Sequence, residues 1–266
     1  MDNSLEYKKP LNQTAIKYIA IIVMTLDHIA HYLGEASPLY LPFRFISRLT
    51  GPIMAYGIAE GYSHTRNVKK YVLRLFICAL ISVIPYSLDE GNDAILFKIV
   101  DGYATSQIFL YMASIDKTLI VYGTNVIFSL LLGLLMIILW DKAKLPKWIK
   151  VLITLVACWL ALFTDWKYVN VLYCLVFYFF RNNKTAKWLS YTAVSMLYIF
   201  NVYFTTNPFN PQPNIKFNLY RMGTLLVIPF IEFLYNGEPG KKSTINKWLF
   251  YIYYPLHFLI LYFIFG

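Results

Sequence analysis

The chain has 266 residues, of which 58% are hydrophobic and 14% are charged, and its mean hydropathy is +0.51. A water-soluble domain of this length would have to expose large apolar patches, so the composition excludes that class and indicates a bilayer protein. The formal net charge of +10 would suggest nucleic acid in a soluble protein, whereas in a membrane protein Lys and Arg first report orientation. We therefore expect a lipid bilayer and no nucleic acid as partner.

Apolar runs long enough to cross roughly 30 Å of hydrocarbon predict an all-α, polytopic helix bundle. The first 14 residues place acids ahead of lysines, and no small-residue cleavage pattern follows, so the first helix is expected to remain uncleaved. We find no internal repeat and expect one domain over residues 1–266. The nine predicted transmembrane helices are 14–34, 41–62, 71–88, 118–140, 147–164, 168–181, 185–204, 219–235 and 248–265.

Positive charge predicts the orientation of these spans. With the N-terminus in the cytoplasm, every loop predicted to lie inside is basic, and the outer loop between the third and fourth spans has more acids than bases. Because positive charge disfavours export, this alternation predicts an N-in, C-out protein of the cell (cytoplasmic) membrane. The inner loops are "HTRNVKK", "DKAKLPKWIK", "RNNKTAK" and "NGEPGKKSTINK".

Three titratable residues interrupt the first span. Asp27, His28 and His31 fall within about one helical turn, where a bilayer core makes an ionised side chain costly. His28 and His31 share a helix face, and Asp27 can bond to His31 or to a facing helix. Packing at the interface is the structural alternative, but three such groups together favour a functional cluster.

The second span begins and ends with charge. Arg44 and Arg48 share one face near its start, and Glu60 and His64 lie near its end. A bundle that encloses Asp27 and Glu60 with both arginines would form a polar cavity. Snorkelling of the arginines to the interface is the alternative.

The loop after the second span has the residues of an anion site. Hydroxyl, amide and glycine residues alternate there with cations, which suits a phosphorylated ligand. The segment 235–242 adds two turns and two lysines on the same predicted side. Ordinary inward positive charge is the competing explanation. The candidate ligand-binding residues are Lys17, His64, Arg66, Lys69, Lys70, Arg74, Asn236, Lys241 and Lys242.

The last predicted span contains a histidine, and the cysteines of the chain lie far from any metal-binding pattern. His257 lies near the middle of the ninth span, two residues after Pro255, and a histidine at that depth needs a partner. The three cysteines have no CxxC or Cys/His spacing, so we expect neither a disulfide framework nor a metal site.

The sequence resembles the TraX family of integral membrane proteins across nearly its whole length. This likeness is specific because several of the shared stretches are polar signatures embedded in different spans. The matching stretches are "IKYIAIIVMTLDHIAHYL", "RFISRLTGPIMAYGIAEGYSHTRNVKKYVLRL", "NVIFSLLLGLLMI", "LYNGEPG" and "KWLFYIYYPLHFLILYF".

The resemblance implies acyl transfer. The family's namesake is similar to an N-acetylase that acts on a conjugative pilin subunit. The family also resembles the transmembrane acyltransferases, including the acyltransferase 3 proteins and the lysosomal heparan glucosaminide N-acetyltransferase. The acyltransferase 3 pattern of a basic residue, ten residues and a histidine is met by Lys17 and His28.

Residues and resemblance together predict an acetyl-CoA-dependent acetyltransferase. Acetyl-CoA, as acyl donor, would bind from the cytoplasm, and His28 would act as general base or be acetylated transiently. Asp27 or Glu60 would orient the ring, with His31 and His257 as reserve proton carriers. The acceptor stays open among a peptide amine, a glycan and a lipid head group. A proton-coupled transporter and an assembly protein are the alternatives.

Overall fold

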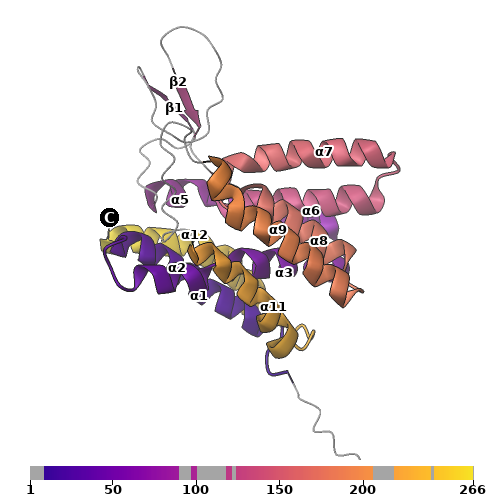
Figure 1. Ribbon diagram of the computed structural model, residues 1–266, viewed down its shortest axis with the longest axis horizontal. Helices are drawn as coiled ribbons and strands as arrows, with labels where there is room; N and C mark the ends of the chain where they lie inside the picture. Colours follow the sequence, from indigo (N-terminus) through magenta and orange to yellow (C-terminus); the bar gives the residue numbers. More distant parts are fainter. Residues whose placement is uncertain are drawn as a thin grey trace, which may run out of the picture.

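The computed structural model describes residues 9–89, 97–100, 118–121, 124–205, 219–240 and 243–265. This part of the chain is a helix bundle with one antiparallel hairpin of β1 (Phe97–Val100) and β2 (Thr118–Val121) (Figure 1). Residues 118–121, predicted to begin the fourth span, therefore lie in a strand. The helices are α1 (Gln13–Leu33), α2 (Tyr40–Ser47), α3 (Thr50–His64), α4 (Val68–Ile81), α5 (Val83–Asp89), α6 (Val126–Lys142), α7 (Lys147–Leu160), η1 (Ala161–Phe163), α8 (Lys167–Phe179), α9 (Lys184–Thr205), η2 (Leu219–Leu226), α11 (Val227–Pro229), η3 (Phe230–Leu234) and α12 (Thr244–Phe265).

Asparagine side chains fix the starts of three helices. Asn12 accepts a hydrogen bond from the N–H of Ala15 at α1, and Asn67 accepts one from the N–H of Lys70 at α4. Asn125 starts α6 in the same way and also donates to the carbonyl of Ala79, 2.9 Å away. These bonds satisfy amide groups that the first turn of a helix leaves unpaired.

Two of the predicted spans are broken helices, and proline explains both breaks. Proline has no N–H and cannot bond to the carbonyl four residues earlier. Pro52 leaves the carbonyl of Arg48 without its helical partner, and α2 and α3 separate there. Pro85 does the same to Ile81, the last residue of α4. The predicted span 41–62 therefore contains two helices, while the predicted span 71–88 lies within Val68–Asp89, a helical segment long and apolar enough to cross a membrane.

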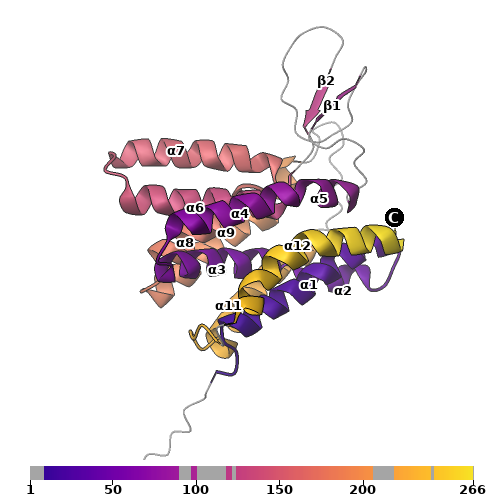
Figure 2. The same ribbon diagram turned by 180° about the vertical axis from the view of Figure 1, so that it is seen from behind.

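Helix α3 lies inside the bundle, packed against α1, α6 and α8 (Figures 1 and 2). Helix α12 runs beside α1 and also contacts α4 and α5. Helices α6 and α8 approach closely because Gly133 has no side chain: a Cβ atom there would lie 2.6 Å from the Sγ atom of Cys174. The side chains in this contact, such as Leu134 and Tyr173, are fully buried.

The outer surface of the bundle is apolar. Within the described residues, three helical segments are long and apolar enough to cross a membrane: Gln13–Leu33, Val68–Asp89 and Trp248–Phe265. The six other predicted spans correspond to shorter or less apolar helices. Helix α7 exposes a stripe that includes Leu152 (52%), Leu155 (59%) and Trp159 (48%). An exposed apolar stripe beside buried polar groups is typical of lipid contact.

A carboxylate joins three helices at one end of the bundle. Asp141, just before the end of α6, accepts hydrogen bonds from the hydroxyls of Tyr178 and Tyr62, each 2.6 Å long. The bond from Tyr178, with that from Tyr62, lowers the pKa of Asp141 below its ordinary value. Since the bonds favour the charged form, they stabilise the fold only while Asp141 is ionised.

The contribution of Asp141 to the free energy of unfolding is expected to fall in acid. Its contribution is complete above the unfolded pKa, about 3.9, and is lost as the pH falls through the lower folded pKa. Asp141→Asn should lower the free energy of unfolding at neutral pH by about 1 kcal/mol. Melting temperatures of both proteins in detergent, measured from pH 7 to pH 3, should converge in acid. A difference that stays constant would contradict this account.

Candidate functional site

His28 of α1 and Asp89, the last residue of α5, form a buried pair. The His28 Nδ1 and Asp89 Oδ2 atoms are 2.9 Å apart, and the side chains are 12% and 0% exposed. The hydroxyl of Tyr32 donates to the other Asp89 oxygen at 2.9 Å. The two groups approach closely, although Asp89 Oδ2 accepts no hydrogen bond from the described residues, and an imidazole that turned its Nδ1–H toward this carboxylate would leave Nε2 as the basic nitrogen.

His257 of α12 is the second histidine at this end. Its ring centroid lies 5.3 Å from that of His28, and its side chain is buried. Nδ1 donates to the carbonyl of Tyr253 at 3.2 Å, while Nε2 has no hydrogen-bond partner among the described residues. The Tyr253 hydroxyl in turn bonds to Thr25 of α1, 2.7 Å away. We call His28, Asp89, Tyr32 and His257 the histidine cluster.

Pro255 shapes α12 beside this cluster. It lacks the N–H that would bond to the carbonyl of Tyr251, one turn earlier. The thiol of Cys78 on α4 donates to that carbonyl at 3.7 Å. A side chain of a neighbouring helix thus satisfies a backbone group that would otherwise be costly inside a membrane.

Asp27, adjacent to His28 in sequence, belongs to a different cluster. Its carboxylate accepts from Arg44 Nη1 at 2.8 Å and from Arg48 Nη2, both of the α2 segment. Arg48 also donates to the hydroxyl of Tyr198 at 3.2 Å and lies 4.9 Å over the ring of Trp166. The arginines thus neutralise Asp27 and attach α1 to α2, while Asp89 is the carboxylate that contacts His28.

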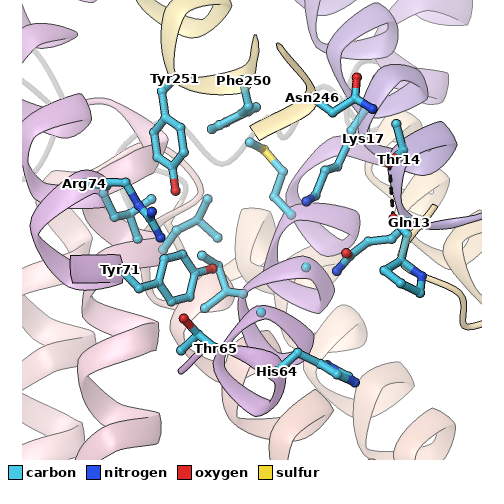
Figure 3. A pocket seen from close by; sticks show the side chains of 18 of the residues that line it. Gln13, Thr14, Lys17, His64, Thr65, Tyr71, Arg74, Asn246, Phe250 and Tyr251 are labelled. Atoms are coloured by element: carbon cyan, nitrogen blue, oxygen red, sulfur yellow. Dashed lines mark hydrogen bonds between the residues drawn. The ribbon is translucent and has the colours of Figure 1, made fainter. Parts of the chain in front are cut away.

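A cavity of about 760 Å³ opens at the other end of α1, between α1, α3, α4 and α12 (Figure 3). The size is that of a pocket for a cofactor-sized ligand. Three of the predicted ligand-binding cations line it, namely Lys17, His64 and Arg74. The buried Nε atom of Arg74 has no hydrogen-bond partner among the described residues. The wall of the cavity is therefore basic and suited to an anionic ligand.

Glycines keep one wall of this cavity open. Gly57 and Gly61 of α3 line it together with Ile58. A Cβ atom at Gly61 would lie 2.9 Å from the hydroxyl of Tyr71, which faces the cavity in Figure 3. Side chains at these positions would narrow the space between α3 and α4.

Lys17 and His28 lie on one face of α1. They are eleven residues apart, and successive residues turn an α-helix by about 100°, so eleven steps return to nearly the same direction. The rise over this distance is about 16 Å. The cavity and the histidine cluster therefore share one stripe of a single helix.

Glu60 lies far from His28. Its carboxylate accepts from the hydroxyl of Tyr235 at 2.7 Å and from Gln13 Nε2 at 3.4 Å. Since Gln13 is fifteen residues before His28, Glu60 is about 22 Å along α1 from the histidine it was expected to orient. His31 is exposed, with its ring beside that of Tyr32.

The exposed cations of the basic loop are not part of the cavity wall, although His64 and Thr65 at its start are. Arg66, Lys69 and Lys70 are exposed, and none of them lines the cavity. Asn236 shapes the turn after η3, where its side chain accepts from the N–H of Glu238 and its own N–H donates to the carbonyl of Leu11.

The turn that Asn236 shapes closes over the start of α1. The hydroxyl of Thr14 donates to the carbonyl of Pro239, and both residues line the cavity. Lys241 and Lys242 lie outside the described residues.

Sequence reasoning missed Asp89. It follows an apolar span and begins an acidic loop, so it has the pattern of an ordinary loop residue. The only sequence signal is its place at the outer end of the third predicted span. The first and third spans run in the same direction, so this end lies at about the same depth in the membrane as His28. Among the described residues, no group of three or more His, Cys, Asp or Glu side chains could hold a metal ion.

Apolar side chains outside and ionisable side chains inside define a helical membrane protein with a buried polar centre. The chain belongs to the TraX family, described as "TraX protein", which matches residues 12–265. It is 29% identical over 247 residues to the probable fimbrial assembly protein FimC, serogroup H1, of Dichelobacter nodosus, with 92% of each chain covered. No solved structure matches the chain. The resemblance to TraX proteins read from the sequence motifs is thereby confirmed.

Proposed function

We propose that this protein is a membrane acetyltransferase that uses acetyl-CoA as acyl donor. One observation carries the proposal: a carboxylate-held histidine and a basic cavity lie on the same face of α1, about 16 Å apart. The phosphates of the donor would meet Lys17, His64 and Arg74. The long pantetheine arm would then run along α1 and bring the thioester to His28.

His28 supplies the proton chemistry of this proposal. Its Nε2 takes a proton from the acceptor amine or hydroxyl while the acceptor nitrogen or oxygen bonds to the thioester carbonyl carbon. As the carbon–sulfur bond breaks, the imidazolium returns that proton to the leaving thiolate. Asp89 stabilises the positive ring between these steps, and Tyr32 holds Asp89. The acetyl group moves from the sulfur of coenzyme A to the nitrogen or oxygen of the acceptor, and no oxidant is required.

We further propose the cell membrane as location, with nine spans and a cytoplasmic N-terminus. The end of the bundle that carries the cavity is also where Tyr62, Asp141 and Tyr178 meet. The basic loops 64–70, 141–150 and 181–187 adjoin these residues. Positive charge on one end supports placing that end in the cytoplasm, where acetyl-CoA is made.

For the acceptor, we propose an amine or hydroxyl of a surface-appendage subunit. The support is the printed name of the relative, a fimbrial assembly protein. The histidine cluster is at the end of α1 away from the basic loops, where an acceptor arriving from outside or from the membrane would meet it. A pilin-like peptide amine is then the first acceptor to test.

Binding of coenzyme A should raise the melting temperature of the purified protein. A ligand that binds only the folded state adds about 2.7 kcal/mol at 100 times its dissociation constant. Lys17→Ala and Arg74→Ala are expected to lose most of this stabilisation, measured in detergent with CoA or acetyl-CoA. Arg66→Ala combined with Lys70→Ala is the matched control, because these exposed cations lie outside the cavity wall.

The control separates a real site from general attraction to positive charge. Equal loss of stabilisation in both sets of variants would contradict a site in the cavity. No stabilisation of well-folded wild type at millimolar ligand would overturn the acetyl-CoA proposal. A proton-coupled transporter, using the same histidines as a proton path, would then be the better explanation.

A further inference from the structure

A second, smaller cavity lies on the opposite face of α3. Its volume is about 140 Å³, several times the roughly 30 Å³ that a water molecule occupies in the liquid. Helix α3 contributes Tyr56, Glu60 and Ser63, Arg181 comes from the segment that joins α8 to α9, and Lys187 comes from the first turn of α9. We call this cavity the recess.

His64 connects the recess to the large cavity. It is the last residue of α3 and lines both spaces. Its Nδ1 lies 2.9 Å from the carbonyl of Glu60, one turn earlier, and so must be the donor. When protonated, the ring presents a second N–H at Nε2 where the two cavities adjoin.

The recess has a cation available for a ligand. The guanidinium of Arg181 lies 4.7 Å over the ring of Tyr178 and donates to the Tyr178 carbonyl at 3.2 Å, which uses one of its five N–H groups. Within the described part of the chain, Arg181 has no salt bridge at the 4 Å limit. An arginine held by its own helix end and lining a cavity is well placed to bind an anion.

The other charged groups of the recess have protein partners. Lys187 Nζ lies 3.6 Å from Glu232 Oε1 and 4.7 Å over the ring of Trp188. Glu60 is bonded to Tyr235 and Gln13. Glu60 thus lines the recess with a carboxylate that already accepts two hydrogen bonds, while Lys187 adds a largely buried positive charge.

We infer that the recess binds the phosphate monoester on the ribose of coenzyme A. The inference rests on the proposed function. The pantetheine and diphosphate would occupy the large cavity, and the nucleotide would bend around the end of α3 at His64. A phosphate monoester carries up to two negative charges and three acceptor oxygens, which the guanidinium of Arg181 and the ammonium of Lys187 match. Arg181 therefore distinguishes coenzyme A from a donor without that phosphate.

The test compares coenzyme A with dephospho-coenzyme A, which lacks only this phosphate. Dissociation constants are measured on the full chain in neutral detergent for wild type, Arg181→Gln and Arg66→Gln. Wild type should bind coenzyme A about tenfold to a hundredfold more tightly, the range for a charged hydrogen-bonded contact. Arg181→Gln should bind both ligands as wild type binds dephospho-coenzyme A. Arg66→Gln should bind both ligands as tightly as wild type does, because Arg66 is exposed and lies outside both cavities.

The outcomes separate the two proposals. Equal affinity of wild type for both ligands would overturn the recess as a phosphate site and leave the acetyl-CoA proposal standing. Binding of neither ligand would overturn the acetyl-CoA proposal itself. Parallel weakening of both ligands in Arg181→Gln would show that Arg181 acts by general attraction, which also overturns the inference. The melting temperature without ligand verifies that the variants are folded.

Discussion

His28→Ala is expected to lower the rate of acetyl transfer by about 10²–10⁴-fold, the usual contribution of a general base. Asp89→Asn should give a loss of similar size, because an amide can no longer stabilise the imidazolium and can hold the ring in the wrong tautomer. The rate is measured as thiol released from acetyl-CoA in the presence of an amine acceptor. Neither residue lines the large cavity, so both variants should keep the stabilisation by coenzyme A.

His31→Ala is the matched control for this experiment. It removes an exposed imidazole one turn from His28 on the same helix, and should leave the rate within about twofold, as expected for a surface substitution. Full activity of His28→Ala would refute its role as base. A loss in Asp89→Asn that comes with lost binding of coenzyme A would point to misfolding and not to chemistry.

Asp27→Asn should destabilise the protein by about 3 kcal/mol, the lower end of the cost of breaking a buried ion pair, because Asp27 and Arg44 are 18% and 22% exposed. The change leaves Arg44 and Arg48 close together without their shared carboxylate. Unfolding in detergent measures the loss. Glu35→Gln, an exposed acid just after α1, should change stability by less than about 0.5 kcal/mol.

The same variant tests how the two clusters divide their roles. Because Asp89 contacts His28, folded Asp27→Asn should transfer acetyl groups at nearly the wild-type rate per molecule. A stable Asp27→Asn protein without activity would reverse this assignment and make Asp27 part of the reaction centre.

Much of the bundle follows from local rules. The apolar runs of α1 and α12 are continuous, and the structure places helices there. The breaks in 41–62 and 71–88 also had a local signal, since Pro52 and Pro85 each remove a helical hydrogen bond. The same rule would also have divided α12 at Pro255, where the helix is continuous, so proline alone does not predict where a helix ends.

The contact partners of the buried charged residues could not be predicted from the neighbouring sequence. Asp27 was predicted to bond to His31 or to a facing helix, and the structure shows the second of these. On a helix, neighbours point about 100° apart, so Asp27 faces α2 and His28 faces α5. The contact between His28 and Asp89 joins residues 61 positions apart, and it depends on α12, which packs against both α1 and α5. Lys17 and His28 were predictable because one helix carries both.

Helix α1 is uninterrupted between Lys17 and His28, and it therefore fixes the distance between these two side chains. A helix fixes the spacing of two side chains by its rise and not by the packing of loops, so thermal motion of the surrounding elements changes it little. An acyl carrier with a shorter arm would bind the basic cavity and leave its thioester short of the imidazole. One residue inserted between the two positions would turn them about 100° apart. If the proposed donor binds as described, the pitch of a single helix sets the length of arm that reaches the imidazole.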